Sequence, residues 1–367
     1  MLESGEPRKD LNCTVTPQKP QLGLDLKFHG GYGVSVPLHE LQGDGNSLSI
    51  LFRVMPKVDN AEPVYFIQQV RVPAIDDKSA GNVTIEGNFD VGLGSYHVDW
   101  LMRDFGGRFC SSYWDFEASL QTKDRRMTVA LPPNTIRRTE DEQFQNEPPV
   151  QRTQDDGPLD VKVLLNFAPQ RPNSPTVDPI DTVALVSILR SISRTPRIGR
   201  FSLVVFNIQE QKELYRQDFA DHIDFPALGA GLKKLSLGTV DLNRLAHKNG
   251  DTEFLSALIK NETTAANSRP DALIFVGPKT LLDSSVPQED LKGVGDLEYP
   301  VFYMNFNPDP IGVPWRDAIG RMVKFFKGRE YTITGPRDLW NAVTEMVSRI
   351  SKSKQGRVTA MTSSGPQ

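Results

Sequence analysis

Cysteine and histidine are scarce in this sequence. Only two cysteines, Cys13 and Cys110, and five histidines occur among 367 residues. An all-cysteine zinc site needs four ligands and is therefore excluded. No two histidines have the spacing that brings metal ligands together on one face of a helix. Two cysteines carry no spacing code, so a disulfide between Cys13 and Cys110 and a pair of free thiols both stay open.

Long apolar runs and an excess of charge of one sign are also missing. The chain has 42 basic and 46 acidic residues, and a net charge of −4 gives no basic footprint for nucleic acid. No apolar run approaches the length of about 20 residues that a membrane helix needs, so no membrane span is expected. The start, MLESGEPRKDLNC, lacks the apolar segment of a signal peptide. We therefore expect either a cytoplasmic protein or a mature form with an added initiator methionine.

The common catalytic motifs are absent as well. The sequence has no G-x-S-x-G elbow and no G-x-x-x-x-G-K-[ST] loop. Gly229-Ala230-Gly231 lacks the third glycine of a dinucleotide fingerprint. His97 and Asp99 share one face of an expected strand, and Ser111 could lie across from them as in an acyl-transfer triad. An exposed polar sheet face is the simpler interpretation, so we assign no catalytic residue, and we expect no cofactor.

The first part of the chain shows the period-two alternation that is typical of β-strands. Residues 47–54 and 64–72 are rich in β-branched and aromatic residues, and residues 95–117 form the clearest hairpin, with a turn at Asp104–Gly107. Residues 1–20 are polar and contain proline, so we expect a loose N-terminal arm. Short strands with turns between them predict an all-β sandwich domain over residues 21–131.

A polar, proline-rich segment follows at residues 132–158. Pro132-Pro133, Pro148-Pro149 and Pro158 interrupt it, and charged residues fill the space between them. Such a segment buries too little apolar surface to offset its ordering entropy. We interpret residues 132–158 as a linker between two domains.

Strands and helices alternate after this linker. Alternation of this kind predicts a mostly parallel sheet with helices on both faces, which is a doubly wound α/β domain. We place this domain at residues 159–350 and expect a disordered tail at residues 351–367. The expected strands are 161–168, 201–206, 212–216, 271–276 and 301–306, and the expected helices are 181–194, 254–260, 315–326 and 336–350.

The order of these parts resembles a von Willebrand factor A domain. The resemblance implies a central strand, a helix, a strand pair with an antiparallel edge strand, and further α/β units. Three local matches carry it: 201–207 followed by 212–216, then Gly250-Asp251-Thr252 with Ala257 as a G-x-T-x-x-x-x-A helix start, and 322–328 with Tyr331 and a terminal helix from Arg337.

The whole chain, including Cys110-Ser111-Ser112-Tyr113-Trp114-Asp115, also resembles uncharacterised secreted proteins from acidobacteria. This second resemblance implies an extracytoplasmic or secreted location and no particular activity.

The metal site that the von Willebrand A resemblance implies is degenerate here. The family's Asp-x-Ser-x-Ser motif reads Asn166-Phe167-Ala168-Pro169-Gln170, and its later aspartate falls near Gly277-Pro278. Thr252 is the only one of these positions that keeps the family's residue type, although Asp251 or Glu253 could substitute for a lost carboxylate. Magnesium prefers near-octahedral oxygen ligands that include carboxylates, so we expect no divalent cation at this site.

The crevice of the domain is still expected to persist, because ligands of open α/β sheets bind beyond the carboxyl ends of the strands. The candidate binding residues there are Asn166, Gln170, Thr252, Lys279 and Asn305, with loop capping as the alternative role. We therefore expect a non-catalytic extracytoplasmic binding or assembly protein, whose partner is another protein. The alternative is an enzyme of unrecognised type that uses this crevice. The sequence leaves the oligomeric state open.

Overall fold

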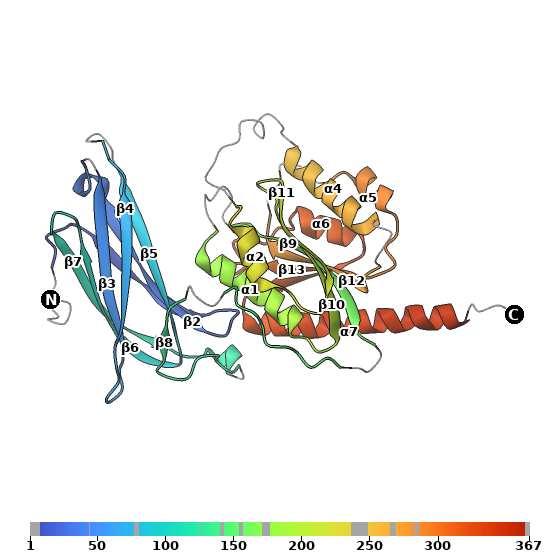
Figure 1. Cartoon of the computed structure of the whole chain (residues 1–367), viewed down its shortest axis with the longest axis horizontal. Coiled ribbons are helices and arrows are strands. Elements are labelled where there is room, and N and C mark those ends of the chain that lie inside the picture. The colour runs from blue at the N-terminus through green and yellow to red at the C-terminus, as the bar shows by residue number, and fades with distance from the viewer. Residues whose placement is uncertain are drawn as a thin grey trace. The chain divides into compact units, whose positions relative to one another are not determined.

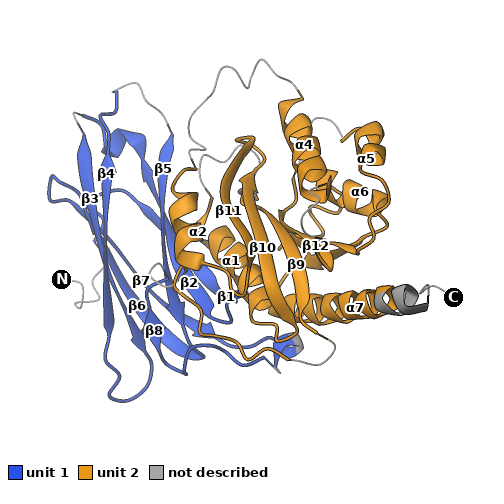
Figure 2. Cartoon of the chain, turned by 45° about the vertical axis from the view of Figure 1, so that its right-hand side comes forward, with its two compact units in different colours: residues 1–141 blue, residues 142–367 orange. Residues whose placement is uncertain are grey.

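The computed structural model divides the chain into two compact units, residues 1–141 and residues 142–367 (Figure 2). We call them unit 1 and unit 2 and describe each by itself. The structure describes residues 8–43, 45–76, 81–125, 127–139, 143–153, 157–170, 177–235, 249–264, 269–280, 282 and 286–363.

Unit 1 consists of two four-stranded antiparallel sheets (Figure 1). One has the strand order β1-β2-β5-β8 and the other β4-β3-β6-β7. Two short 3₁₀ helices, Leu38–Glu40 and Thr122–Asp124, lie in the connections. The strands are β1 (Thr14–Leu22), β2 (Phe28–Pro37), β3 (Asn46–Pro56), β4 (Val64–Val72), β5 (Asn82–Val91), β6 (Gly94–Arg103), β7 (Phe109–Ala118) and β8 (Ile136–Arg137).

A cluster of aromatic side chains joins the two sheets of unit 1. Tyr32 of β2 lies edge-on to Phe52 of β3 and to Trp100 of β6, with ring centroids 5.3 and 5.4 Å apart. Phe89 of β5 packs against the stacked rings of Phe52 and Phe66. Aromatic rings bury large apolar areas, so this cluster holds the two sheets face to face.

The N-terminal segment is more ordered than the sequence predicts. The expected loose arm at residues 1–20 is wrong for its second half, because β1 pairs with β2 and Leu11 is fully buried. Residues 1–7 lie outside the described residues. Cys13 and Cys110 form a disulfide with their Cα atoms 6.3 Å apart, within the range that disulfide geometry spans.

Unit 2 contains one six-stranded mixed sheet with the order β11-β10-β9-β12-β13-β14. β11 runs antiparallel to β10 at one edge, and the remaining neighbours are parallel. The central strands are buried along their length, as expected for strands with helices on both faces. The six strands of this sheet are β9 (Leu159–Asn166), β10 (Ile198–Asn207), β11 (Lys212–Ala220), β12 (Ala272–Pro278), β13 (Val301–Phe306) and β14 (Arg329–Ile333).

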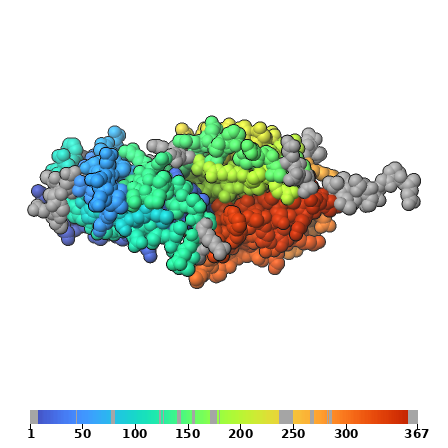
Figure 3. Space-filling model, turned by 90° about the horizontal axis from the view of Figure 1, so that it is seen from below, coloured from blue at the N-terminus to red at the C-terminus, as the bar shows by residue number. Residues whose placement is uncertain are grey.

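Helices cover both faces of this sheet. Side chains of α4, α5 and α6, among them Leu255, Leu291 and Ile319, share one apolar core with the sheet residues of that face. The helices α1, α2 and α7 lie over the other face (Figure 2), where α7 runs beside α1 on the surface (Figure 3). The helices are α1 (Pro179–Ser193), α2 (Phe225–Leu232), α4 (Gly250–Thr264), α5 (Gln288–Val294), α6 (Ala318–Phe325) and α7 (Pro336–Ser363). In the described part of the chain, no helix has the length and apolar character that crossing a membrane requires.

The C-terminal segment differs from the sequence prediction. We expected a disordered tail from residue 351, but α7 continues to Ser363. Lys354 donates to the Pro158 carbonyl oxygen and to Asp271, and Arg357 donates to the second oxygen of Asp271. These contacts come from residues about 80 or more positions away in sequence, so the local sequence does not reveal them. Residues 364–367 lie outside the described residues.

The expected linker is only partly correct. Within residues 132–158, the strand β8 pairs with β5 and belongs to unit 1. Residues 143–153 pack on unit 2, where Glu147 forms ion pairs with Arg190 and Arg194. Arg152 donates to the carbonyl oxygens of Ser193 and Asp221 on the same unit. Residues 140–142 and 154–156, which also belong to the predicted linker, lie outside the described residues.

Candidate functional site

The predicted binding residue Asn166 ends β9 in the centre of the sheet and is fully buried. Its amide donates to the Thr280 hydroxyl at 2.9 Å, and its carbonyl oxygen accepts from the Ile208 main-chain nitrogen at 3.2 Å. Gly277 lies so close that an added Cβ would stand 3.0 Å from both the Cβ and the main-chain carbonyl oxygen of Asn166. A carboxylate at residue 277 therefore has no room unless the neighbouring strand shifts.

Gln170 and Thr252 are engaged within the protein as well. The Gln170 side chain donates to Asp181 at 2.7 Å, which ties the loop after β9 to the first turn of α1. Thr252 is 5% exposed in the first turn of α4, and its neighbour Asp251 accepts from Gln211 at 2.8 Å. Both loops at the carboxyl ends of the strands are therefore anchored through these polar groups, which favours the capping role.

Asn305 lies on β13 and points toward the neighbouring strand β14. It donates to Glu330 at 3.0 Å, while its own Oδ1 finds no hydrogen-bond partner in the part of the chain that the structure describes. Glu330 also accepts from Arg316 at 2.9 Å. Asn305 therefore supports the β13–β14 edge and does not share partners with Asn166.

A buried carboxylate that the sequence analysis missed organises the same end of the sheet. Asp317 caps α6 by accepting from the Gly320 main-chain nitrogen, and it also accepts from the Thr280 nitrogen and the Tyr303 hydroxyl. Burial raises the pKa of Asp317 above its usual value, although these three donors act in the opposite direction. A tertiary arrangement brings these partners together, so the sequence held no direct signal for the cluster.

Lys279 has a different role from the other candidate residues. Its ammonium donates to the carbonyl oxygens of Val313 and Trp315, at 2.6 Å each. Asn307 donates to the same Val313 oxygen at 3.1 Å, and Asp309 accepts from the Gly312 nitrogen at 2.9 Å. The loop between β13 and α6, residues 307–317, is therefore held by several bonds at the carboxyl end of β13.

This loop carries an apolar surface. Ile311 is 90% exposed and Trp315 is 37% exposed, and Pro308, Pro310 and Pro314 are exposed around them. We call residues 307–317 the display loop. Large apolar side chains on a fixed, exposed loop are typical of a surface that binds another protein.

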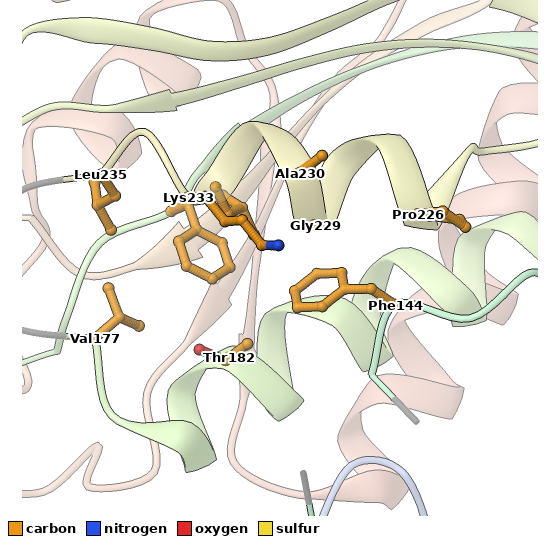
Figure 4. A pocket seen from close by; sticks show the side chains of 10 residues that line it. Phe144, Val177, Thr182, Pro226, Gly229, Ala230, Lys233 and Leu235 are labelled. Carbon is orange, nitrogen blue, oxygen red and sulfur yellow. The ribbon is translucent and has the colours of Figure 1, made fainter. Parts of the chain in front are cut away.

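A pocket of about 590 Å³ lies between α1 and α2 (Figure 4). Its walls are mainly apolar, and its polar groups are Thr182 and Lys233, with the Lys233 side chain running toward Phe144. Gly229 lets Phe144 approach, because an added Cβ there would stand 2.7 Å from the Phe144 ring. The sequence analysis missed this pocket, because Phe144 lies in a segment that we interpreted as linker.

Among the described residues, the group of side chains that most resembles a metal site lies in unit 1. Asp25, His29 and Asp90 bring one possible ligand atom each within 4.8 Å of one another. However, the two imidazole nitrogens of His29 each contact a carboxylate, at 3.0 Å from Asp25 and 2.8 Å from Asp90. Burial acts to lower the pKa of His29, but the two carboxylates outweigh it and raise the pKa to about 9. The arrangement fits a protonated histidine bridging two acids.

The triad considered for His97, Asp99 and Ser111 does not assemble. The two nitrogens of His97 contact Asp115 at 2.6 Å and Asp99 at 3.2 Å. The Ser111 hydroxyl accepts from the Arg8 main-chain nitrogen at 2.7 Å, and Ser111 stands opposite Leu101 in the sheet. His97 is partly exposed, whereas Asp99 and Ser111 are buried, so the simpler expectation of an exposed polar sheet face holds for His97 alone.

No family model matches the chain, and no curated protein matches it either. Among solved structures, it is similar to a β-glucosidase from Listeria innocua, with 10% identity over 30% of this chain and a TM-score of 0.19. The chain spans 17% of that enzyme. The putative ApaA protein from Bordetella pertussis is 12% identical over 32% of this chain and 98% of its own, with a TM-score of 0.20. The minor pilin PilB from Streptococcus sanguinis is 8% identical over 87% of this chain and 89% of its own, with a TM-score of 0.26. None of these similarities is close enough to support a shared fold.

Proposed function

We propose that the chain is a non-catalytic, extracytoplasmic binding or assembly protein that uses a β-sandwich and a metal-independent domain like von Willebrand factor A. The order of the sheet in unit 2, with its antiparallel strand β11 at one edge, supports the likeness to that family. The disulfide between Cys13 and Cys110 supports an oxidising compartment outside the cytoplasm.

The observation that carries the binding function is the display loop. Lys279 and Asn307 fix its main chain, while Ile311 and Trp315 remain exposed. Holding a binding loop in one conformation before association lowers the entropy cost of binding. Isoleucine and tryptophan can fill an apolar pocket on a partner, and tryptophan is enriched among residues that dominate binding energy. The partner is therefore another protein with a complementary apolar hollow.

The contacts made at the positions that the von Willebrand A resemblance assigns to metal ligands support independence from metal. The side-chain amide of Asn166 donates to Thr280 and accepts from the main-chain nitrogen of Ile208. The close approach of Gly277 to Asn166 leaves no space for a carboxylate at residue 277. A divalent cation would have to displace these bonds and would find too little negative charge there. The display loop lies next to this end of the sheet and can contact a partner without a bridging ion.

Affinity capture from extracts of the source organism tests the proposal. The full chain serves as bait beside Ile311→Asp and Trp315→Ala. Two matched controls change exposed residues of the same type elsewhere: Ile180→Asp on α1, where the isoleucine is 48% exposed, and Trp340→Ala on α7, where the tryptophan is 65% exposed. We expect the same protein to be captured by the unchanged chain and both controls, and to be lost with both display-loop variants. Chelator should make no difference. Equal capture by all five baits, or capture that needs magnesium, would contradict the proposal.

The alternative function is an enzyme that uses the crevice at the carboxyl ends of the strands. The observation in its favour is the α1–α2 pocket, which reaches this region through Phe167, the residue after β9. Its size is suited to a small ligand, but an enzyme also needs converging polar groups, and this pocket offers Thr182 and Lys233. If the chain is an enzyme, Lys233→Met should remove its activity, while capture through the display loop should be unchanged.

A further inference from the structure

An unpaired sheet edge can bind another strand, and proteins usually protect their edges. Most sheet edges in the described part of this chain are protected. β1 contains Pro17, Lys19 and Pro20 and has an irregular register at residues 18–21. β8 has only two residues. Residues 8–11 cover one half of β7 through main-chain hydrogen bonds. The Ser111 nitrogen donates to the Arg8 oxygen, and the Leu11 nitrogen donates to the Phe109 oxygen.

The remaining half of β7 and both edges of unit 2 carry charged residues. Asp115 and Glu117 lie on β7. β11 carries four charged residues and has two breaks in its register with β10. β14 is five residues long and begins with Arg329 and Glu330. Charge, irregular register and short length all discourage the addition of a further strand.

β4 shows none of these protections. It pairs with β3 over nine residues in an unbroken register and has no other neighbouring strand among the described residues. It contains no proline, and its only charged residue is Arg71 near its end. On its outer face Ile67 is 67% exposed and Tyr65 is 46% exposed. A long, regular and apolar edge of this kind is a ready site for strand addition.

The sequence of β4 is suited to pairing with itself. In an antiparallel pair related by a twofold axis at Ile67, the two exposed Ile67 side chains face each other, and Tyr65 faces Gln69 of the other copy. Directly opposite residues lie on the same face of a sheet, so the apolar surfaces meet at the centre. In the same register Arg71 lies opposite Pro63 of the other copy, so that Glu62, the next residue, lies beside Arg71. Opposite charges therefore meet at both ends.

We infer that β4 pairs antiparallel with β4 of a second copy of this chain, which joins two four-stranded sheets into one eight-stranded sheet across a twofold axis. A single strand pair is smaller than a standard protein interface. The dimer therefore forms and dissociates with concentration. This surface lies on unit 1 and is independent of the display loop on unit 2.

Sedimentation velocity of the full chain over a concentration series tests the inference. We expect a reversible monomer–dimer equilibrium. Ile67→Lys should weaken it about tenfold or more, since two opposed charges would replace the central apolar contact. Ile180→Lys is the matched control, because it changes an exposed isoleucine on α1, outside both proposed binding surfaces, and should leave dimerisation intact. If partner capture fails while the dimer persists, the proposed function is wrong and the present inference stands.

Disulfide trapping tests the register and keeps the test valid if Ile67→Lys fails to fold. The two natural cysteines are bonded to each other, so Ile67→Cys introduces a single free thiol. In the proposed register the two new thiols face each other, and oxidation should produce a covalent dimer. Gln69→Cys, two residues along the same face, should cross-link at least about tenfold more slowly, since its Cα lies beyond the reach of a disulfide from its counterpart.

Four results would overturn the inference. One is a chain that stays monomeric at every concentration. Another is a dimer that folded Ile67→Lys leaves unchanged. The third is equal cross-linking by Ile67→Cys and Gln69→Cys. A monomer that instead binds a strand of a different protein through β4 would also reject a second copy as the occupant.

Discussion

The ammonium group of Lys279 donates a 2.6 Å hydrogen bond to the carbonyl oxygen of Trp315 and lies 5.4 Å from the centre of that residue's ring. A second bond from the same ammonium reaches the Val313 carbonyl oxygen. Lys279 follows β12, whereas the display loop follows the neighbouring strand β13. One side chain therefore fixes the main chain on which Ile311 and Trp315 are exposed.

Lys279→Met should loosen the display loop while leaving the fold intact. Two carbonyl oxygens lose a charged donor, and we expect hydrogen exchange in residues 307–317 to become faster. Each lost hydrogen bond should reduce the stability of the loop conformation by about 1 kcal/mol. Partner capture should weaken as the loop becomes less ordered. Lys292→Met is the control, because Lys292 is exposed on α5. Unchanged exchange in the loop would show that Lys279 does not hold it.

Some strands of this fold could be predicted because their patterns are local, whereas β2 and β5 were not among the expected strands. Residues 64–72 and 301–306 were predicted with the same bounds as β4 and β13, since apolar or alternating runs end at clear turn residues. β1 was missed because Pro17 and Pro20 argue against a strand, although an edge position tolerates them. α2 was missed because its eight residues include a proline and two glycines.

The candidate site was less predictable. The sequence placed Asn166 and Lys279 at the carboxyl ends of two strands, but the roles of both residues depend on partners that are distant in sequence. The Asn166 amide donates a hydrogen bond to Thr280, which lies more than 100 residues later in the sequence. Residues 307–314 read as an ordinary proline-rich connection, and the next helix was wrongly expected to begin at Trp315, because α6 begins only at Ala318. Only the exposure of the display loop and its bonds to Lys279 distinguish it. Such pairings arise from the fold and leave no periodic signal.

The stability of unit 1 should depend on pH through His29. The pKa of His29 is raised from 6.5 to about 9 in the folded state, so the folded chain binds this proton more tightly than the unfolded chain. The stabilisation is complete below about pH 6.5 and is lost as the pH rises through about 9. The rise corresponds to at most about 3 kcal/mol. His29→Gln should therefore destabilise unit 1 at pH 6 and have a smaller effect at pH 10.

Hydrogen exchange of the amides in β2 and β5, measured as a function of denaturant, can follow unit 1 within the full chain. His39→Gln is the matched control, because His39 is 64% exposed at its side chain and has only a weak contact with Glu40. A His29→Gln effect that is the same at both pH values would mean that the histidine contributes through packing and not through its charge.

Removal of the disulfide should weaken unit 1 selectively. Cys13 and Cys110 are 97 residues apart, and closing a loop of this length stabilises the folded state by about 5 kcal/mol in the chain-entropy account. Cys13→Ser combined with Cys110→Ser should lower the melting temperature of unit 1 and increase exchange in β1, with little change in unit 2. Both serines are needed, since a single substitution leaves a reactive thiol. An unchanged melting temperature would show that the hydrogen bonds of residues 8–11 to β7 suffice.

The last prediction concerns a buried ion pair in unit 2. Lys162 on β9 donates to the Glu262 carboxylate at 3.1 Å, and both side chains are 5% exposed. Burial acts to raise the pKa of Glu262, but Arg216 and Lys162 outweigh it and lower the pKa. The carboxylate therefore stabilises the fold above its ordinary pKa, and this contribution is lost as the pH falls.

Glu262→Gln should cost about 3 kcal/mol, because it leaves Lys162 buried without an opposite charge. Lys162→Met should cost less, since Arg216 remains beside Glu262 at 2.7 Å. The double variant Lys162→Met with Glu262→Gln should be more stable than the sum of the single effects predicts, because neither charge is then left without its partner. Denaturant unfolding of the four chains gives the coupling energy directly. A coupling energy near zero would mean that Arg216 alone neutralises Glu262 and that Lys162 is held by its 3.0 Å bond to the Glu262 main-chain oxygen.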